Sequence, residues 1–167
     1  MKIRRLRAAN ETDIAQLADV LVDCVEGGSS VSFMLPLTRE RAMEFWRGVA
    51  NDLDRRVLLV AEDDRGICGT VQLIFAEPEN QPHRADVSKM LVHRRARRQG
   101  IATALMRELE KEARACGKTL LVLDTADPTA ERVYERTGWT RLGVIPKYAL
   151  LPNGGYCDTV VFFRDLT

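Results

Sequence analysis

The chain has 167 residues, of which 46% are hydrophobic and 29% charged, with a formal net charge of +1. This length and composition predict one globular domain, residues 1–167, with its own hydrophobic core. A net charge near zero gives no global attraction to nucleic acids or anionic membranes. The longest apolar runs, Val57–Ala61 and Leu120–Leu123, are too short to span a bilayer, and the first residues lack the apolar run of a secretory signal.

The cysteine and histidine content predicts no metal site. The four cysteines are scattered without a Cys-x-x-Cys pair, and there are only two histidines. Four reduced thiols are therefore expected, which is typical of a cytoplasmic protein. The cysteines are Cys24, Cys68, Cys116 and Cys157, and the histidines are His83 and His93.

The first third of the chain predicts one short strand and two helices. Ile3–Leu6 is strand-like. Asn10 and Asp13 form a helix-start pattern, and apolar residues then recur at helical spacing until Gly27. Thr38 is a candidate N-cap for a second helix.

The middle of the chain changes to a strand-like period. Arg56–Glu62 and Ile67–Phe75 predict two strands joined by a turn. A third strand is expected over Ala85–Val92, although the apolar alternation slips between Val87 and Met90. A β-bulge would produce such a slip.

The last third alternates helices with strands. Gly100–Cys116 predicts the longest helix, and Leu120–Leu123 predicts a strand buried on both faces. Asp127 followed by Pro128 is a helix opening, and Gly138 ends that helix. Two closing strands are expected at Trp139–Val144 and Thr159–Phe163. The order is β-α-α-β-β-β-α-β-α-β-β, an α+β layout in which helices cover one mixed sheet.

The loop before the long helix, Arg97–Ala102, has the features of a phosphate site. The first amides of a helix have no intrahelical partners, and Gly100 lets the backbone approach an anion closely. Two arginines add positive charge. Two other interpretations stay open: a basic loop without a ligand, and a nucleic-acid patch that also includes Arg94 and Arg95. The patch is disfavoured because no aromatic platform flanks it.

Two blocks of sequence carry a resemblance to a known family. Arg97–Ala102 is similar to the cofactor signature of the GNAT acetyltransferases, in which Arg or Gln precedes x-x-Gly-x-Gly/Ala. Ala130–Trp139 resembles the block Ala-x-x-x-Tyr-x-x-x-Gly-Phe/Trp of the same family. The chain is therefore identified as a member of the GNAT superfamily. The resemblance implies a central mixed, twisted sheet of about seven strands with about four helices, and acetyl-CoA as the cofactor.

Three further segments resemble the tabtoxin-resistance acetyltransferases within that superfamily: Glu26–Met34, His83–Val92 and Leu123–Thr125. The resemblance implies acetyl transfer to the primary amine of a small molecule, such as an amino acid, an amino-acid-like toxin or an antimetabolite, by direct attack in a ternary complex. The alternatives are a peptide or protein N-acetyltransferase and a non-catalytic CoA-binding sensor. A homodimer is also expected, with no nucleic-acid or membrane partner.

The resemblance also implies the residues that hold acetyl-CoA. Backbone groups of the third strand would bind the acetyl-pantetheine arm, with the amide of Leu91 as the donor to the carbonyl oxygen. Tyr134 would protonate the leaving sulfur, although it could simply pack its helix on the sheet. Asp127 could contact the cofactor or serve only as an N-cap. The expected cofactor-binding residues are Met90, Leu91, Val92, Arg97, Arg98, Gln99, Gly100, Ile101, Ala102, Thr103, Asp127 and Tyr134.

The acceptor side is expected to contain two aspartates and one loop. Asp86 and Asp124 would bind the substrate ammonium, and either could accept its proton; solvated or capping roles are the alternatives. The expected catalytic residues are thus Tyr134, Asp124 and Asp86. In the loop Gly28–Met34, serines could bind a carboxylate and apolar residues could form the pocket wall, or those apolar residues could merely clamp the loop. The expected substrate-binding residues are Ser30, Ser32, Phe33, Met34, Asp86 and Asp124.

Overall fold

The computed structural model describes residues 1–167 and has seven strands, four α-helices and one short 3-10 turn, η1 (Arg94–Ala96). The strands are β1 (Lys2–Leu6), β2 (Arg56–Asp63), β3 (Gly66–Phe75), β4 (Arg84–Val92), β5 (Leu120–Thr125), β6 (Thr140–Leu150) and β7 (Tyr156–Asp165). The helices are α1 (Glu11–Glu26), α2 (Arg39–Ala50), α3 (Ile101–Ala115) and α4 (Pro128–Arg136). The predicted order of elements is confirmed.

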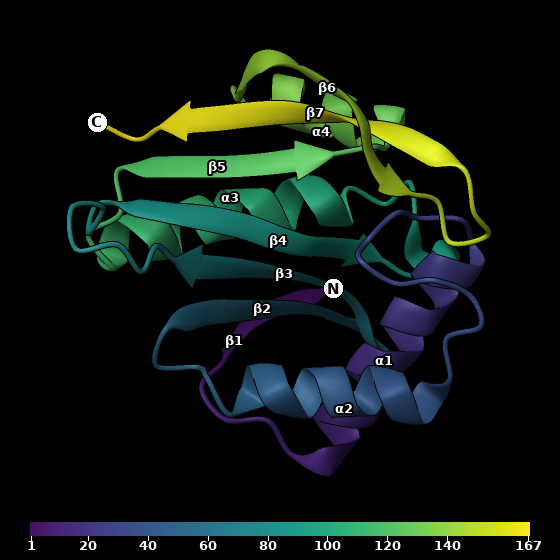
Figure 1. The fold of residues 1–167 in the computed structure, drawn as a ribbon. Helices are drawn as coiled ribbons and strands as arrows, with labels where there is room; N and C mark the ends of the chain where they lie inside the picture. The colour runs from purple at the N-terminus through teal and green to yellow at the C-terminus, as the bar shows by residue number, and fades with distance from the viewer.

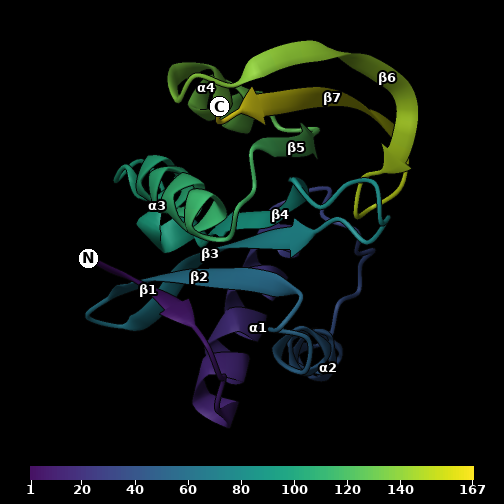
Figure 2. The same ribbon diagram turned by 90° about the vertical axis from the view of Figure 1, so that its left-hand side faces the viewer.

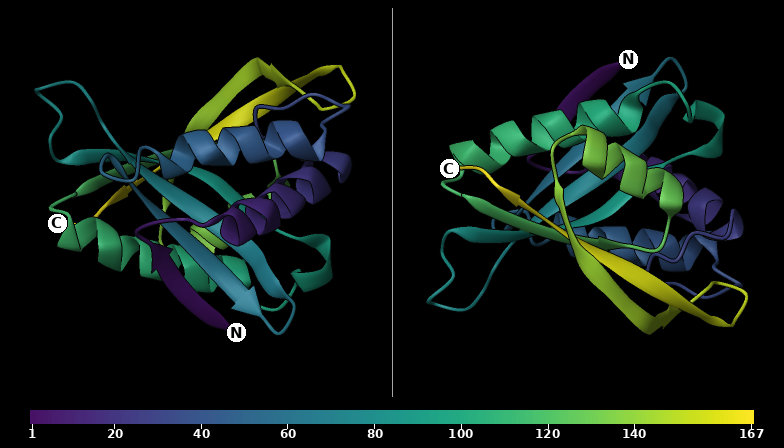
Figure 3. Two further views of the ribbon diagram at one scale, coloured as in Figure 1. Left: turned by 90° about the horizontal axis from the view of Figure 1, so that it is seen from below. Right: turned by 90° about the horizontal axis from the view of Figure 1, so that it is seen from above.

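All seven strands form one mixed sheet in the order β1-β2-β3-β4-β5-β7-β6. Only the β4–β5 pair is parallel, and the other neighbours are antiparallel. Helices α3 and α4 cover one face of the sheet, whereas α1 and α2 lie on the other (Figures 1 and 2). Figure 3 shows the twist that separates β1 at one end from the β6–β7 hairpin at the other. The expected α+β layout is confirmed.

The helices begin at the predicted capping residues. The Asn10 side chain accepts a hydrogen bond from the Asp13 amide, and the Asp13 carboxylate accepts one from the Asn10 amide, which completes a capping box for α1. The Thr38 hydroxyl caps α2 by accepting from the Arg41 amide. At α4, the Asp127 carboxylate accepts from the Thr129 amide at 2.8 Å. Local sequence therefore sets where each of these helices starts.

Two apolar cores lie on opposite faces of the sheet. The larger core contains the buried face of α3, including Leu105 and Leu109, together with Tyr134 and Trp139. The smaller core joins α1, α2 and the other face of the sheet around Trp46, which is fully buried. No helix is both long enough and apolar enough to cross a membrane. All four cysteines are free thiols.

Strand β4 contains the predicted bulge and then separates from β5. Thr70 pairs with Leu91 while Gln72 pairs with Ser88, so Lys89 and Met90 share one partner position on β3. Lys89 has a φ of 51°, in the left-handed region. The parallel pairing of β4 with β5 stops at Asp86. Beyond that point, the β5-facing edge of β4 has no strand partner.

The β6–β7 hairpin is longer than the sequence indicated. The expected strands Trp139–Val144 and Thr159–Phe163 are in fact Thr140–Leu150 and Tyr156–Asp165. Nearly all β6 side chains are exposed, so no apolar alternation marks its second half. The extra length carries the hairpin over the α1–α2 side of the molecule (Figure 2).

Candidate functional site

One large cleft, with a volume of about 860 Å³, opens where β4 and β5 separate. Its walls come from the second half of β4, the start of α3, the end of β5, α4 and the β6–β7 hairpin. The loop after α1 closes it, with Gly27–Ser32 in the lining. Segments distant in the sequence therefore meet at this cleft.

The phosphate loop forms one end of the cleft. Gly100 has a φ of 76° and is the N-cap of α3, where no side chain caps the free amides. A Cβ at Gly100 would meet no atom within 4 Å, so the left-handed backbone, rather than a lack of space, favours glycine. The backbone of Arg98 is also in the left-handed region, with a φ of 63°. The helix start thus presents unpaired N–H donors and a positive dipole end toward the cleft.

The edge of β4 supplies the next set of backbone groups. The His93 amide donates to the Cys68 carbonyl of β3 at 2.9 Å. The backbone N–H and C=O groups of successive residues in a strand point to opposite edges. Those of Leu91 therefore also point toward β3, whereas those of Met90 and Val92 point to the opening toward β5. The Val92 carbonyl accordingly accepts from Arg97 Nε on the cleft side. This register directs the Leu91 amide toward the β3 ladder, so the amides of Met90 and Val92 are better placed than the expected Leu91 amide to meet a cofactor in the opening.

Tyr134 lines the cleft from α4 and is only 4% exposed. Its ring packs on Trp139 and Phe162, with centroids 6.0 and 5.6 Å away. Burial, reinforced by Asp127 and Asp124, raises the pKa of this phenol well above its ordinary value. A tyrosine that stays protonated can serve as a proton donor at the cleft, so packing and chemistry are compatible roles for it.

Asp124 is the second-last residue of β5; it is exposed and lines the cleft. The buried Thr159 hydroxyl of β7 donates to Asp124 Oδ2 at 2.7 Å and orients it. Asp86 lies on the same sheet face, because it pairs with Val122, two residues before Asp124. Its carboxylate, however, binds Arg84 at 2.5 Å and is not part of the cleft lining. The structure thus places Asp124 and Tyr134 in the same cleft and leaves Asp86 outside its lining.

The chain matches one family over most of its length. A model described as the acetyltransferase (GNAT) family covers residues 19–139. This chain belongs to the GNAT acetyltransferase family. An N-acetyltransferase of the hisH–hisA intergenic region in Azospirillum brasilense is 32% identical to it over 127 residues, which is 75% of each chain. The protein is therefore an N-acetyltransferase that uses acetyl-CoA.

Solved structures confirm the GNAT fold. A phosphinothricin acetyltransferase from Sinorhizobium meliloti in complex with acetyl-CoA is similar with a TM-score of 0.83 and 20% identity, over 99% of this chain and 89% of that one. A ribosomal-protein-alanine N-acetyltransferase from Brucella melitensis has a TM-score of 0.82 and 23% identity, over 99% and 100% of the chains. Since these two names describe different acceptors, the fold does not identify the acceptor of this enzyme.

The GNAT cleft fits acetyl-CoA on three local observations: the uncapped start of α3, the unpaired edge of β4 and the volume between them. Of the expected cofactor residues, all but Gln99 line the cleft. Asp127 lines it too, but its carboxylate is engaged in capping α4. His93 lies outside the lining, where its Nδ1 accepts from the Arg95 amide.

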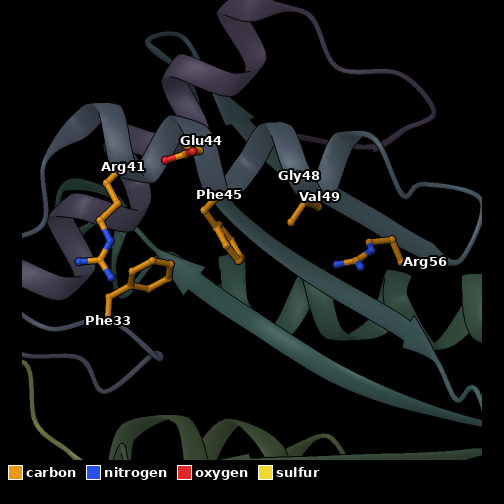
Figure 4. Close-up of a pocket in the computed structure, with 7 residues that line it drawn as sticks. All are labelled: Phe33, Arg41, Glu44, Phe45, Gly48, Val49 and Arg56. Carbon is orange, nitrogen blue, oxygen red and sulfur yellow. The ribbon is translucent and has the colours of Figure 1, made fainter.

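The expected substrate-binding residues of the loop after α1 lie in two different places. Ser30 and Ser32 line the cleft. Phe33 instead packs edge-on against Phe45 of α2 at 5.2 Å and lines a separate pocket of about 450 Å³ along that helix (Figure 4). Met34 is 39% exposed and lines neither pocket. Phe33 thus clamps the loop to α2, and of the expected loop residues only Ser30 and Ser32 line the cleft.

Proposed function

We propose that this GNAT enzyme acetylates the primary amine of a small molecule of the amino-acid class. The observation that carries the proposal is the exposed Asp124 carboxylate, held by Thr159 in the same cleft as Tyr134. A carboxylate attracts an ammonium group, and a buried phenol can donate a proton. The cleft thus contains the two groups that amine acetylation requires.

Acetyl-CoA supplies the acetyl group as a thioester. In the proposed mechanism, Asp124 binds the acceptor ammonium and accepts one proton, which leaves a neutral amine nitrogen to attack the thioester carbon. One amide of the open β4 edge, that of Met90 or Val92, donates to the carbonyl oxygen as negative charge develops there. As the new C–N bond forms and the C–S bond breaks, Tyr134 donates its proton to the departing sulfur. The second proton of the amine restores Tyr134, directly or through solvent, so protons and charges balance.

A closed acceptor side favours a small molecule over a protein chain. The Ser30 hydroxyl donates to the Leu150 carbonyl at 3.1 Å, and the Leu35 amide donates to the Pro152 carbonyl at 2.8 Å. These bonds tie the loop after α1 to the β6–β7 hairpin, and both segments line the cleft, which is thus closed on that side. A role in resistance to an amino-acid-like toxin is part of this proposal.

The test is acetyl-CoA-dependent thiol release across a panel of free amino acids, polyamines, dipeptides and tabtoxinine-like amines. We expect saturable turnover with amino-acid-like amines and little with peptides. Turnover with peptides alone would support the peptide N-acetyltransferase alternative. Tight acetyl-CoA binding without turnover of any amine would support the sensor alternative.

We also propose that the enzyme is a homodimer through the β6–β7 hairpin. Several apolar side chains are exposed on it, including Leu142 at 70% and Tyr156 at 71%. Several large apolar side chains exposed on one hairpin are typical of an interface. Ile145→Asp combined with Tyr148→Asp is expected to change the sedimenting species from the mass of two chains to that of one. A wild-type protein that sediments as a single chain at micromolar concentration would contradict the proposal.

A further inference from the structure

Lys89 is a charged residue of the cleft for which the mechanism has no role. It lies in the β4 bulge, is partly buried and lines the cleft. Its ammonium Nζ donates to Ser32 Oγ at 3.2 Å and lies 5.6 Å from the centre of the Phe45 ring. It forms no ion pair with any carboxylate of the protein.

The bulge is what brings this charge to the acceptor side. Ala85 and Val87 face the core beneath α3, and regular alternation would place Lys89 in the same core. Because the bulge adds one residue, Met90 packs there instead. Lys89 extends to the opposite face, where it contacts Ser32 and Phe45.

An ammonium group in this position lacks a counter-ion. Removing a charge from water is unfavourable unless hydrogen bonds or an opposite charge compensate. One serine hydroxyl and one aromatic face compensate only in part, since an ammonium has three donors. Burial accordingly lowers the pKa of Lys89, against the opposing effect of Asp124. An anionic group bound in the cleft would complete the coordination of Lys89.

The aromatic layer behind Lys89 keeps it in place. Phe45 contacts both Lys89 and Phe33, and Figure 4 shows the two phenylalanine rings adjacent beside α2. Phe33 belongs to the same loop as Ser32. The loop therefore fixes both the hydroxyl and the ring that contact the ammonium.

We infer that Lys89 binds the carboxylate of the acceptor, so that the substrate carries an anionic group as well as the amine that Asp124 receives. This inference rests on the proposed function and deepens it. It divides the acceptor half of the cleft into a cation-binding group, Asp124, and an anion-binding group, Lys89. A zwitterionic amino acid satisfies both, whereas a simple amine or a polyamine leaves Lys89 without a counter-ion.

The test compares free amino acids with their carboxamides, which keep the amine and lose the negative charge. For wild-type enzyme we expect KM for the acid to be on the order of 10- to 100-fold below KM for the carboxamide, since a charge-assisted contact is lost. Lys89→Met is expected to raise KM for the acid by a similar factor and to change KM for the carboxamide less than about threefold. Lys89→Arg is expected to keep most of the preference.

Lys147→Met is the matched control, because Lys147 also has a positive φ, 52°, but its side chain is exposed on β6 and outside the cleft lining. It is expected to behave as wild type. Calorimetry with CoA-loaded protein repeats the comparison without turnover. An acid that binds no better than its carboxamide would overturn the inference even where carboxamides are acetylated and the proposed function stands. An equal loss for both in Lys89→Met would also overturn it, because Lys89 would then act by positioning Asp124.

Discussion

Tyr134→Phe is expected to lower kcat by about 10²- to 10³-fold, the usual contribution of one general acid. The affinity for acetyl-CoA is expected to change less than about threefold, because the ring keeps its packing on Trp139 and Phe162. The phenol forms no hydrogen bond within the protein, so its loss leaves no buried partner unsatisfied. Steady-state kinetics and acetyl-CoA titration measure the two quantities.

The raised pKa of Tyr134 adds a pH dependence to this prediction. Burial is the largest cause of the increase, and the carboxylates of Asp127 and Asp124 add to it. The phenol therefore keeps its proton at pH values where an ordinary tyrosine, with a pKa of about 10, begins to lose it. A leaving thiol has an unperturbed pKa of about 8.5, so its thiolate still requires a proton at neutral pH. We expect kcat of the wild type to show no decline from tyrosine ionisation below about pH 10.

Tyr156→Phe is the control for the loss of a phenol, because Tyr156 is 71% exposed on the hairpin and outside the cleft lining. It should retain wild-type kcat. If Tyr134→Phe also turned over at the wild-type rate, another group or water would have to protonate the sulfur, and Tyr134 would only pack α4 on the sheet.

The fold could be predicted from the sequence where local chemistry determines structure. Asn10, Thr38 and Asp127 each cap a helix as expected, and the slipped alternation before Met90 is a real bulge. The ends of strands β6 and β7 could not be predicted in this way. Its outer half is exposed, so its strand conformation comes from pairing such as that of Ala149 with Cys157. A strand stabilised by its partner rather than by burial leaves no periodic pattern in its own sequence.

The site could be predicted only as far as motifs identify residues. The two GNAT blocks located the α3 loop and Tyr134, and both line the cleft. The ion pair that holds Asp86 depends on Arg84, two residues away on the same strand face, and no motif marks that pairing. Lys89 was missed for a related reason. Its regular position would be a core position, and a lysine there was itself the signal that the bulge turns it outward.

Asp124→Asn is expected to lower kcat/KM for the amine acceptor by about 10²-fold or more at pH 7, because the variant can neither balance the ammonium charge nor accept its proton. A free amino acid keeps its α-ammonium proton at neutral pH, so the acceptor becomes neutral in solution only as the pH rises into the alkaline range. The loss should therefore decrease to about tenfold or less near pH 10, where deprotonation no longer depends on the enzyme. The profile of kcat/KM between pH 6 and pH 10 tests this, with acetyl-CoA binding as the check on folding.

Thr159→Val separates the charge of Asp124 from its orientation. It removes the donor at 2.7 Å and keeps the carboxylate, so we expect a loss of only several-fold at pH 7 with the wild-type pH profile. A loss in Asp124→Asn that stayed constant from pH 6 to pH 10 would contradict the role in proton transfer, because binding alone would then explain it. Near wild-type activity of Asp124→Asn would remove Asp124 from the mechanism. Asp86, on the same sheet face and held by Arg84, would then be the carboxylate to test next.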